Sequence, residues 1–222
     1  MFSYFRFETV LPHLPYLLAG ARMTIIVSLV ALAGAMTIGL ILALARLAKL
    51  RVLRVGASLF IDIWRSTPTL AQLLWVYYAL PILTGVPMSA FTAGAITLAC
   101  HYGANLAEVY RAGILAIPSG QMNAALALGQ TRAQAMRRIV LPQAITIMLP
   151  LIASQFIVLF KESALVSMIS LEELMWHGQS LAGLTMRSVE VFSLVALIYV
   201  VLTYPQTLLV NWLHRRSVAA AR

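Results

Sequence analysis

Long apolar runs, separated by short charged or proline-containing segments, constrain this 222-residue chain more than any other feature. A helix needs about 20 apolar residues to cross the hydrocarbon core of a bilayer. Hydrophobic residues make up 61% of the sequence and charged residues 10%, whereas soluble domains have about 45–50% and about 25%. The sequence therefore predicts an all-α membrane protein with no room for a separate soluble domain.

We expect about five transmembrane helices within a single transmembrane domain that occupies residues 1–222. The predicted spans are 15–47, 55–80, 90–114, 139–160 and 189–213. The residues before the first span are expected at the membrane interface, and no cleavable signal peptide is expected. Charge pairs and shorter apolar runs between the last two spans favour a re-entrant or interfacial helix on the outer side.

The basic residues predict the orientation, because Lys and Arg accumulate in the cytoplasmic loops of membrane proteins. Ten of the sixteen would lie in loops or a tail on one side: Arg46, Lys49, Arg51, Arg54, Arg132, Arg137, Arg138, Arg215, Arg216 and Arg222. This places the N-terminus outside and the C-terminus inside. Because these residues cluster at span ends, the net charge of +9 does not indicate a nucleic-acid-binding protein.

Polar residues interrupt the second predicted span. Asp62 and Arg65 are three residues apart, so they could pair on one face of a helix. Pro68 stands between Thr67 and Thr69, and proline removes a backbone donor while freeing a carbonyl that hydroxyls can bind. The sequence therefore predicts a local break here, which could be a hinge or the wall of a cavity.

The third predicted span carries His101, Asn105 and Glu108 at spacings of four and three, which place them on one helical face. Ionisable groups within spans usually face a partner or a cavity. The three residues could line a path or hydrogen-bond a neighbouring helix, and Glu108 could simply pair with Arg111. They are too sparse to indicate a metal site.

Lys161 and Glu162 follow the fourth apolar run, where they could point inward or form a local ion pair. The sequence has no phosphate-binding P-loop, no serine elbow and no paired metal-ligand motif. We therefore expect no enzyme and no cofactor in this chain, which would be a conduit or one part of a larger machine.

The segment 118–138 between the third and fourth spans is basic and helix-forming. Its small residues would allow close approach to another backbone, and exposed Met122, Leu126 and Leu128 would suit a docking surface. Its arginines could instead hold an amphipathic helix on anionic membrane lipid. The residue types alone leave both interpretations open.

This segment resembles the cytoplasmic signature loop of type I ABC importer permeases from bacteria. That pattern is Glu-Ala-Ala, three residues, Gly, nine residues, Ile, one residue, Leu-Pro. Every interval is present here, in Asn123-Ala124-Ala125, Gly129, Ile139 and Leu141-Pro142. Further stretches resemble the polar amino-acid branch, which includes permeases for histidine, glutamine and acidic amino acids: RSTPTLAQLL at 65–74, AEVYRAGI at 107–114, GQ at 120–121 with LPQA at 141–144, and FKESALVSMISLEEL at 160–174.

The resemblance implies a multi-pass permease subunit of the bacterial cytoplasmic (inner) membrane that imports polar amino acids, with glutamate, aspartate or glutamine as candidates. In that family a coupling helix in the loop sits on a dimer of cytoplasmic ABC ATPases, which bind ATP and Mg. The other implied partners are a second permease subunit, identical or paralogous, and a periplasmic or lipid-anchored substrate-binding protein. An autonomous secondary amino-acid transporter or channel is the alternative.

The resemblance assigns ATPase coupling to Asn123, Ala124, Ala125, Leu128, Gly129, Arg132, Arg137, Arg138, Leu141 and Pro142. The expected substrate path contains Thr67, Thr69, Gln72, Asn105, Glu108, Lys161, Glu162 and Ser163. Two departures from the family stand out. Asn123 occupies the position of the usual glutamate, so coupling here would depend more on packing than on an ion pair. Glu162-Ser163-Ala164 replaces Asp-Thr-Ser, which removes a hydroxyl.

Overall fold

The computed structural model describes residues 6–220, and these residues form helices and short connections without a strand. Two 3-10 turns, Phe7–Thr9 and Leu11–His13, lead into the first long helix. They occupy the part of the chain where an interfacial lead-in is predicted. The predicted cytoplasmic Arg222 lies outside the described residues.

Helix α1 (Leu14–Leu47) is 34 residues long and packs mainly against α5 (Ala90–Leu115). Small residues bring the two backbones close together. A Cβ atom on Gly39 would lie 2.9 Å from the carbonyl oxygen of Gly103, so a larger residue at position 39 would push α1 away from α5. This contact fixes α5, which carries much of the site described below, against the longest helix of the fold.

The second predicted span is broken, as the sequence predicts. Helix α2 (Arg51–Ser66) runs beside α1, and Thr67 and Pro68 are extended, with ψ of 144° and 136°. A residue before proline is driven out of the helical region. The Thr67 hydroxyl donates to the carbonyl oxygen of Ile63 at 2.8 Å, which satisfies a backbone acceptor that the broken helix leaves free.

After the break the chain forms α3 (Thr69–Leu74), a π-helical turn (Trp75–Ala79) and α4 (Leu80–Thr84). Helix α4 ends at Gly85, whose φ of 70° is left-handed. The next helix, α5, begins at Ala90 after Ser89, which accepts a hydrogen bond from the backbone N–H of Thr92 at 3.1 Å. The segment predicted as an outer turn therefore ends at Ser89, the N-cap of α5.

The second half of the chain contains, in order, α6 (Ser119–Ala127), α7 (Arg132–Ala135), a π-helical turn (Met136–Val140), α8 (Leu141–Glu162), a 3-10 segment (Ser163–Ile169), α9 (Leu174–Thr185) and α10 (Ser188–Ala220). Continuous helix leads into the fourth predicted span from Arg132, through α7 and the π-helical turn, so it begins before the predicted residue 139. Helix α9 occupies the segment for which a re-entrant or interfacial helix is predicted.

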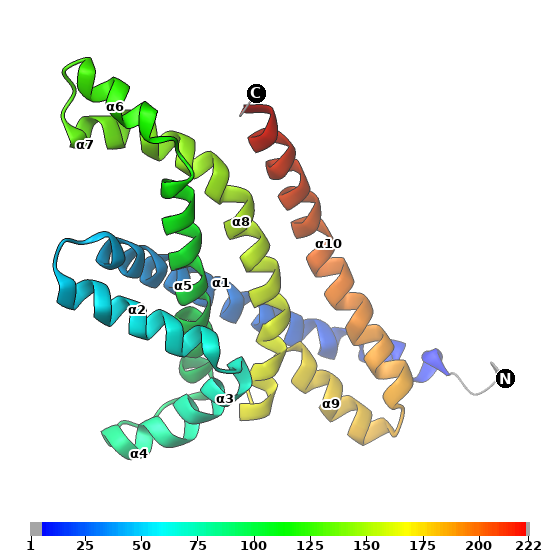
Figure 1. The fold of residues 1–222 in the computed structure, drawn as a ribbon. Coiled ribbons are helices and arrows are strands. Elements are labelled where there is room, and N and C mark those ends of the chain that lie inside the picture. The colour runs from blue at the N-terminus through cyan, green and yellow to red at the C-terminus, as the bar shows by residue number, and fades with distance from the viewer. Residues whose placement is uncertain (1–5, 221–222) are drawn as a thin grey trace.

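The α6–α7 hairpin projects from one end of the molecule, the end at which α10 finishes, whereas α4 and α9 lie at the opposite end (Figure 1). Helix α8 contacts both α5 and α10. Three described segments are long and apolar enough to cross a membrane: Phe7–Leu47, Arg132–Ile169 and Ser188–Arg216. The five-span topology and its orientation stay predictions.

The ion pair considered between Asp62 and Arg65 is not formed. Asp62 is exposed on α2, and Arg65 donates from Nε to Oδ1 of Asn105 on α5 at 3.2 Å. Among the described residues no ion pair joins Asp62 to Arg65. Arg65 lies in the last turn of α2, where the neighbouring α5 offers it an amide oxygen.

Candidate functional site

A cluster of polar side chains gathers beside the break in the second predicted span, with residues from α3, α5 and α8. The Thr69 hydroxyl donates to Oε2 of Glu162 at 3.0 Å. His101 lies 3.5 Å from Thr69 through Nε2 and 2.9 Å from Oε1 of Gln72 through Nδ1. Thr69 and Gln72 are buried, whereas His101 and Glu162 are partly exposed. The cluster therefore joins three segments of the chain and remains open on one side.

Two hydroxyls, those of Thr69 and Tyr102, hydrogen-bond the Glu162 carboxylate, and no cation among the described residues pairs with it. Nε2 of Gln72 donates to the carbonyl oxygen of Trp64 at 2.7 Å and to both oxygens of Thr67 at 3.1 and 2.5 Å. The amide oxygen of Gln72 therefore faces Nδ1 of His101, which must carry a proton. A neutral His101 then presents the lone pair of Nε2 to Thr69. The single hydroxyl proton of Thr69 is shared between His101 and Glu162.

A cavity of about 390 Å³ lies beside this cluster. Trp64 and Trp75 are among its walls, and Thr67 and Gln72 contribute the polar groups. Its volume falls within the usual range of small-molecule sites, about 300–1,000 Å³, which combine apolar walls with a few polar groups. The break at Pro68 thus creates both the polar cluster and an adjoining cavity.

Asn105 lies one helical turn after His101 on α5, a rise of about 6 Å, and it contacts Arg65 of α2. The amide of Asn105 donates to the carbonyl oxygen of His101 at 3.1 Å, while its Oδ1 accepts from Nε of Arg65. Arg65 is exposed and keeps further guanidinium donors. A positive donor group therefore stands beside Asn105, one turn along α5 from His101.

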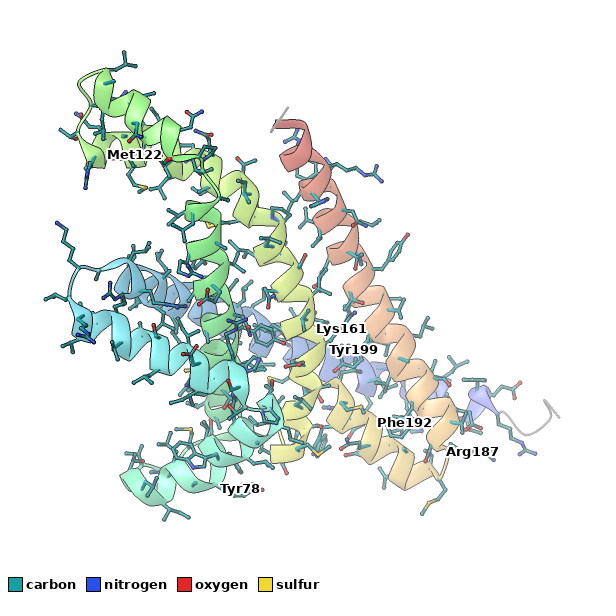
Figure 2. All side chains as sticks on the ribbon, in the orientation of Figure 1. Tyr78, Met122, Lys161, Arg187, Phe192 and Tyr199 are labelled. Carbon is teal, nitrogen blue, oxygen red and sulfur yellow. The ribbon has the colours of Figure 1, made fainter. Side chains whose placement is uncertain are left out.

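Three residues of the expected substrate path lie apart from this cluster. Glu108 accepts from Arg46 and from Arg111, so the local Glu108–Arg111 pair is confirmed. Lys161 is exposed and lines a separate cavity of about 410 Å³ that also contacts Tyr199 (Figure 2). Ser163 is fully buried and donates to the carbonyl oxygen of Phe160 at 2.8 Å. The structure brings together Thr67, Thr69, Gln72 and Glu162, with Asn105 one turn away.

His101 and Arg65 belong to this polar group although neither is in the expected path. The helical spacing of His101 and Asn105 signals a shared face, but it does not reveal which helix that face meets. Among the described residues, no group of three or more His, Cys, Asp or Glu side chains is placed to hold a metal ion. The hydroxyl, amide, imidazole and carboxylate groups of the cluster can hydrogen-bond an organic ligand.

The α6–α7 hairpin turns at Gly129, whose φ is 79°. The backbone N–H of Gly129 donates to the carbonyl oxygen of Leu126 at 3.0 Å, and that of Gln130 donates to Ala125 at 3.1 Å. These two bonds form a Schellman motif, which requires a left-handed residue and therefore favours glycine. A Cβ atom on Gly129 would meet nothing within 4 Å. The turn, rather than crowding within this chain, accounts for glycine here.

The hairpin is a packed unit with an exposed surface. Ala125 is 1% exposed and lies inside it, whereas Leu128 is 81% exposed. Thr131 caps α7 in a capping box with Gln134, whose side-chain oxygen accepts from the Thr131 N–H at 2.8 Å. The other exposed residues to which coupling is assigned are Asn123, Ala124, Gly129, Arg132, Arg137, Arg138 and Pro142, and Leu141 is partly buried.

The exposed face of the hairpin is strongly basic. Arg132, Arg137 and Arg138 are exposed, and no carboxylate among the described residues pairs with them. Met122 lies on α6 in the same hairpin (Figure 2). A projecting surface that combines an unpaired positive charge with an exposed leucine is suited to contact with another molecule.

The family of binding-protein-dependent transport system inner membrane components matches residues 35–219. The chain belongs to this family. The glutamine transport system permease protein GlnP of Escherichia coli (strain K12) is 34% identical over 96% of this chain and 97% of its own length. The probable amino-acid ABC transporter permease protein YckA of Bacillus subtilis (strain 168) is 36% identical over 88% of this chain and 86% of its own.

Solved structures agree with this assignment. A crystal structure of an amino acid ABC transporter with histidines is similar with a TM-score of 0.90 at 36% identity, covering 96% of this chain and 99% of that one. The inward-facing MetNI methionine ABC transporter shares the fold, with a TM-score of 0.72 at 20% identity over 91% and 98% of the two chains.

The chain is therefore a multi-pass membrane protein and a permease subunit of an ABC importer, and ATP is handled by a partner chain. The family implies an ATPase and a substrate-binding protein as partners. The resemblance, the all-α fold class and the transport role predicted from the sequence are confirmed, and the role is not that of an enzyme.

Proposed function

We propose that this chain forms the membrane pathway of an importer for polar amino acids in the bacterial cytoplasmic membrane. Its relatives named as glutamine and amino-acid permeases support this substrate class. The chain would act as a single transmembrane domain beside a second permease subunit, identical or paralogous. A dimer of cytoplasmic ATPases would bind ATP and Mg, and a periplasmic or lipid-anchored binding protein would deliver glutamine, glutamate or aspartate.

The substrate would bind at the break beside Pro68. An amino acid needs an acceptor for its ammonium group and a donor for its carboxylate. The observation that carries this proposal is the carboxylate of Glu162, which contacts only the hydroxyls of Thr69 and Tyr102 and no cation among the described residues, and so offers acceptor capacity to an ammonium group. Arg65 would meet the substrate carboxylate one turn away. Thr67, Gln72 and Asn105 would contribute hydrogen bonds, while Glu108, Lys161 and Ser163 make no direct contact.

Glu162→Gln tests the substrate site. Neutralising the carboxylate removes a charge-assisted hydrogen bond to the ammonium group, so binding-protein-dependent uptake into vesicles should fall about tenfold or more. Lys161→Gln is the control, because Lys161 is the neighbouring residue but lines the separate cavity beside Tyr199. Its uptake should stay close to that of the unmodified transporter. Equal uptake in the two variants would exclude Glu162 from substrate recognition.

The α6–α7 hairpin would couple this chain to the ATPase. Its projecting basic surface would sit in a groove of the partner, with Leu128 in contact and Ala125 supporting the hairpin from inside. Asn123 would hydrogen-bond the partner without supplying the negative charge of the usual glutamate. The grip would therefore depend on shape and on Arg132, Arg137 and Arg138.

Gly129→Asn tests the docking surface without disturbing the backbone turn. Asparagine tolerates a left-handed conformation, so the turn is kept while a side chain is added to the exposed face. Gly85 is also left-handed, with open space around it, at the other end of the molecule. We expect Gly129→Asn to abolish ATP-dependent uptake and Gly85→Asn to retain it, with both proteins reaching the membrane.

Uptake measured in vesicles that contain the purified protein also distinguishes an importer from an autonomous transporter. If the purified chain alone moves amino acids in response to an ion gradient, without the ATPase, the coupling proposal is wrong. Normal ATP-dependent uptake by Gly129→Asn would also contradict the assigned role of the hairpin surface, while leaving the substrate proposal to be judged by Glu162→Gln.

A further inference from the structure

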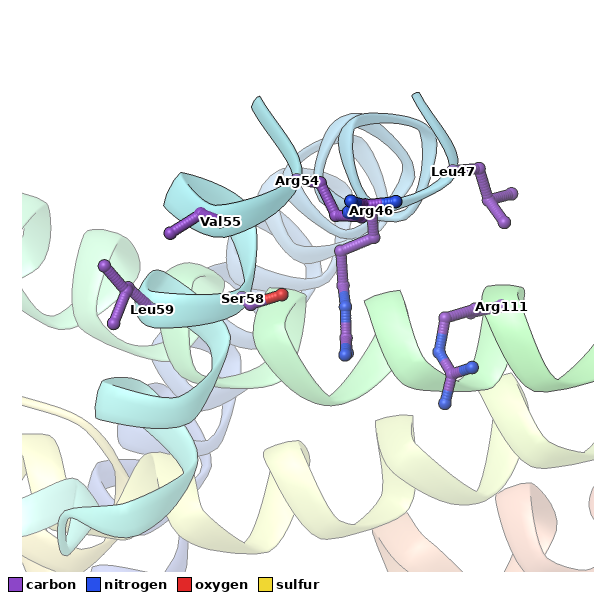
Figure 3. Close-up of a pocket in the computed structure, with 7 residues that line it drawn as sticks. All are labelled: Arg46, Leu47, Arg54, Val55, Ser58, Leu59 and Arg111. Atoms are coloured by element: carbon purple, nitrogen blue, oxygen red, sulfur yellow. The ribbon is translucent and has the colours of Figure 1, made fainter. Parts of the chain in front are cut away.

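A third pocket, of about 380 Å³, lies where the end of α1, the start of α2 and the last turns of α5 meet. Arg46, Arg54 and Arg111 come from these three helices, and Figure 3 shows Arg46 extending between α2 and α5. The adjoining wall is apolar and includes Val55 and Leu59 from α2. The pocket therefore combines a cationic base with an apolar side and is separate from the candidate substrate cavity.

The cationic side of this pocket is not neutralised. Glu108 accepts from both Arg46 and Arg111, so one carboxylate serves two guanidinium groups. Arg54 has no carboxylate partner among the described residues, and the Ser58 hydroxyl lacks a hydrogen-bond partner among them. Each arginine has five N–H donors, and several remain available. Two net positive charges and a free hydroxyl thus favour an oxyanion.

The apolar side extends as a stripe along α2. Val52, Val55, Leu59 and Ile63 are spaced by three, four and four residues, and all are exposed. Eleven residues of helix rise about 16 Å, which is close to one leaflet of the hydrocarbon core, about 15 Å. A ligand with an anionic head and a long apolar tail would satisfy both parts of the surface.

The location suits a membrane lipid. Arg111 lies one turn before the end of α5, and the α6–α7 hairpin follows that end directly. Lys49 and Arg51 in the α1–α2 connection are also basic, so the positive-inside rule assigns this end to the cytoplasmic face. Basic pockets between membrane helices on that face are suited to anionic headgroups.

We propose that this pocket binds an anionic phospholipid. The phosphate group is held by Arg46, Arg54 and Arg111 with the help of Ser58, and one acyl chain lies along the stripe on α2. A bound lipid tethers the ends of α1, α2 and α5 together at the base of the α6–α7 hairpin. Lipid binding is measured without transport, so it is judged independently of the proposed substrate.

The test is native mass spectrometry of the purified transporter titrated with phosphatidylglycerol, phosphatidylcholine or inorganic phosphate. We expect one phosphatidylglycerol held tightly per permease chain, with phosphatidylcholine bound at least tenfold more weakly, as expected for charge-assisted recognition. Arg54→Gln is the decisive variant, because Arg54 has no ion pair whose loss would disturb folding. It should weaken phosphatidylglycerol binding about tenfold, the loss of one charge-assisted hydrogen bond.

Two further variants define the ligand. Arg51→Gln removes an exposed charge on the same helix outside the pocket and should leave phosphatidylglycerol binding within about twofold, because it removes only a screened surface charge. Leu59→Gln, on the apolar wall, should weaken phosphatidylglycerol binding and leave any binding of inorganic phosphate unchanged.

Several results would overturn the proposal. Equal binding of the two lipids would remove the role of the phosphate charge, and an equal effect of Arg51→Gln would indicate only general surface attraction. Inorganic phosphate that competes fully with the lipid, with no effect of Leu59→Gln, would indicate a simple anion site. Normal lipid binding by Arg54→Gln together with loss of the ATPase or second permease subunit would identify a protein interface instead.

Discussion

Two glutamates eleven residues apart, Glu162 and Glu173, occupy contrasting environments. Glu173 is fully buried where α1, α9 and α10 meet, and it accepts hydrogen bonds from Thr24 at 3.1 Å, Tyr199 at 3.0 Å and the backbone N–H of Trp176 at 2.9 Å. Glu162 is partly exposed, contacts the hydroxyls of Thr69 and Tyr102, and has no backbone N–H donor or ion-pair partner among the hydrogen bonds and ion pairs of the described residues.

The difference in burial and in spare acceptor capacity separates a structural glutamate from a candidate ligand-binding one. Burial raises the pKa of the Glu173 carboxyl, while its several hydrogen bonds act in the lowering direction. A buried acid with its oxygens occupied has no capacity for a ligand, and its donors depend on it. A partly exposed acid with spare acceptor capacity and no cation beside it can accept a ligand at little cost to the fold. Four substitutions test this contrast.

Glu173→Ala should have the largest effect on stability. It removes the N-cap of α9, worth about 1 kcal/mol. It also removes the acceptor of the partly buried Tyr199 hydroxyl and leaves the buried Thr24 hydroxyl with only the carbonyl oxygen of Gly20, at about 1 kcal/mol each. We expect a loss of about 3 kcal/mol or more in the free energy of unfolding, seen as a lower Tm and a lower membrane yield of the purified transporter. Glu172→Ala alters the exposed neighbour, and similar Tm values for the two variants would remove the contrast.

Thr24→Val should be the next most damaging. The Thr24 hydroxyl donates to Glu173 and accepts from the backbone N–H of Leu174 at 3.1 Å. A valine of similar shape leaves that N–H without its acceptor and removes one of the donors to Glu173, at about 2 kcal/mol. Thr37→Val is the matched control on α1, because its exposed hydroxyl bonds only the carbonyl oxygen of Ala33. If thermal unfolding gives the same Tm for both variants, the network around Glu173 does not stabilise the fold.

Tyr199→Phe should cost less, about 1 kcal/mol, because Glu173 keeps its other donors. The ring remains in place against Phe160, with the two ring centroids 6.4 Å apart. Thermal unfolding should show a small decrease in Tm, compared with none for Tyr204→Phe, an exposed tyrosine on the same helix. A decrease as large as that of Glu173→Ala would mean that Tyr199 alone holds the cluster together.

Glu162→Gln should change stability least, by no more than about 0.5 kcal/mol, because the amide oxygen still accepts from Thr69 and the site is partly exposed. The sharpest form of the contrast is therefore an unchanged Tm in a transporter whose uptake is impaired. A decrease in Tm comparable to that of Thr24→Val would make Glu162 a structural residue like Glu173.

Local features of this chain could be predicted from the sequence. The break at Pro68 follows from the missing N–H of proline and the restriction that it places on Thr67. The turn at Gly129 follows from the freedom of glycine at positive φ. The Glu108–Arg111 pair follows from the spacing of one helical turn. Each depends on residues within a few positions of one another.

Partners supplied by distant segments could not be predicted in this way. Thr69 is 93 residues from Glu162, and Thr24 is 149 residues from Glu173. Helical spacing permitted an Asp62–Arg65 pair, but α5 brought the amide of Asn105 to Arg65 instead. Which face of a helix meets which neighbour depends on packing of the whole chain, and the sequence alone left those faces unassigned.

The π-helical turn at Met136–Val140, between α7 and α8, has a mechanical consequence. A π turn holds one residue more than an α turn. Its conversion to α-helix would rotate the α6–α7 hairpin about 100° around the axis of α8 and shift it by about 1.5 Å. A helical wheel drawn straight through residues 132–162 therefore misaligns its two ends. The π turn therefore holds one extra residue between the α6–α7 hairpin and α8, where a movement of the proposed ATPase partner would reach the membrane helices.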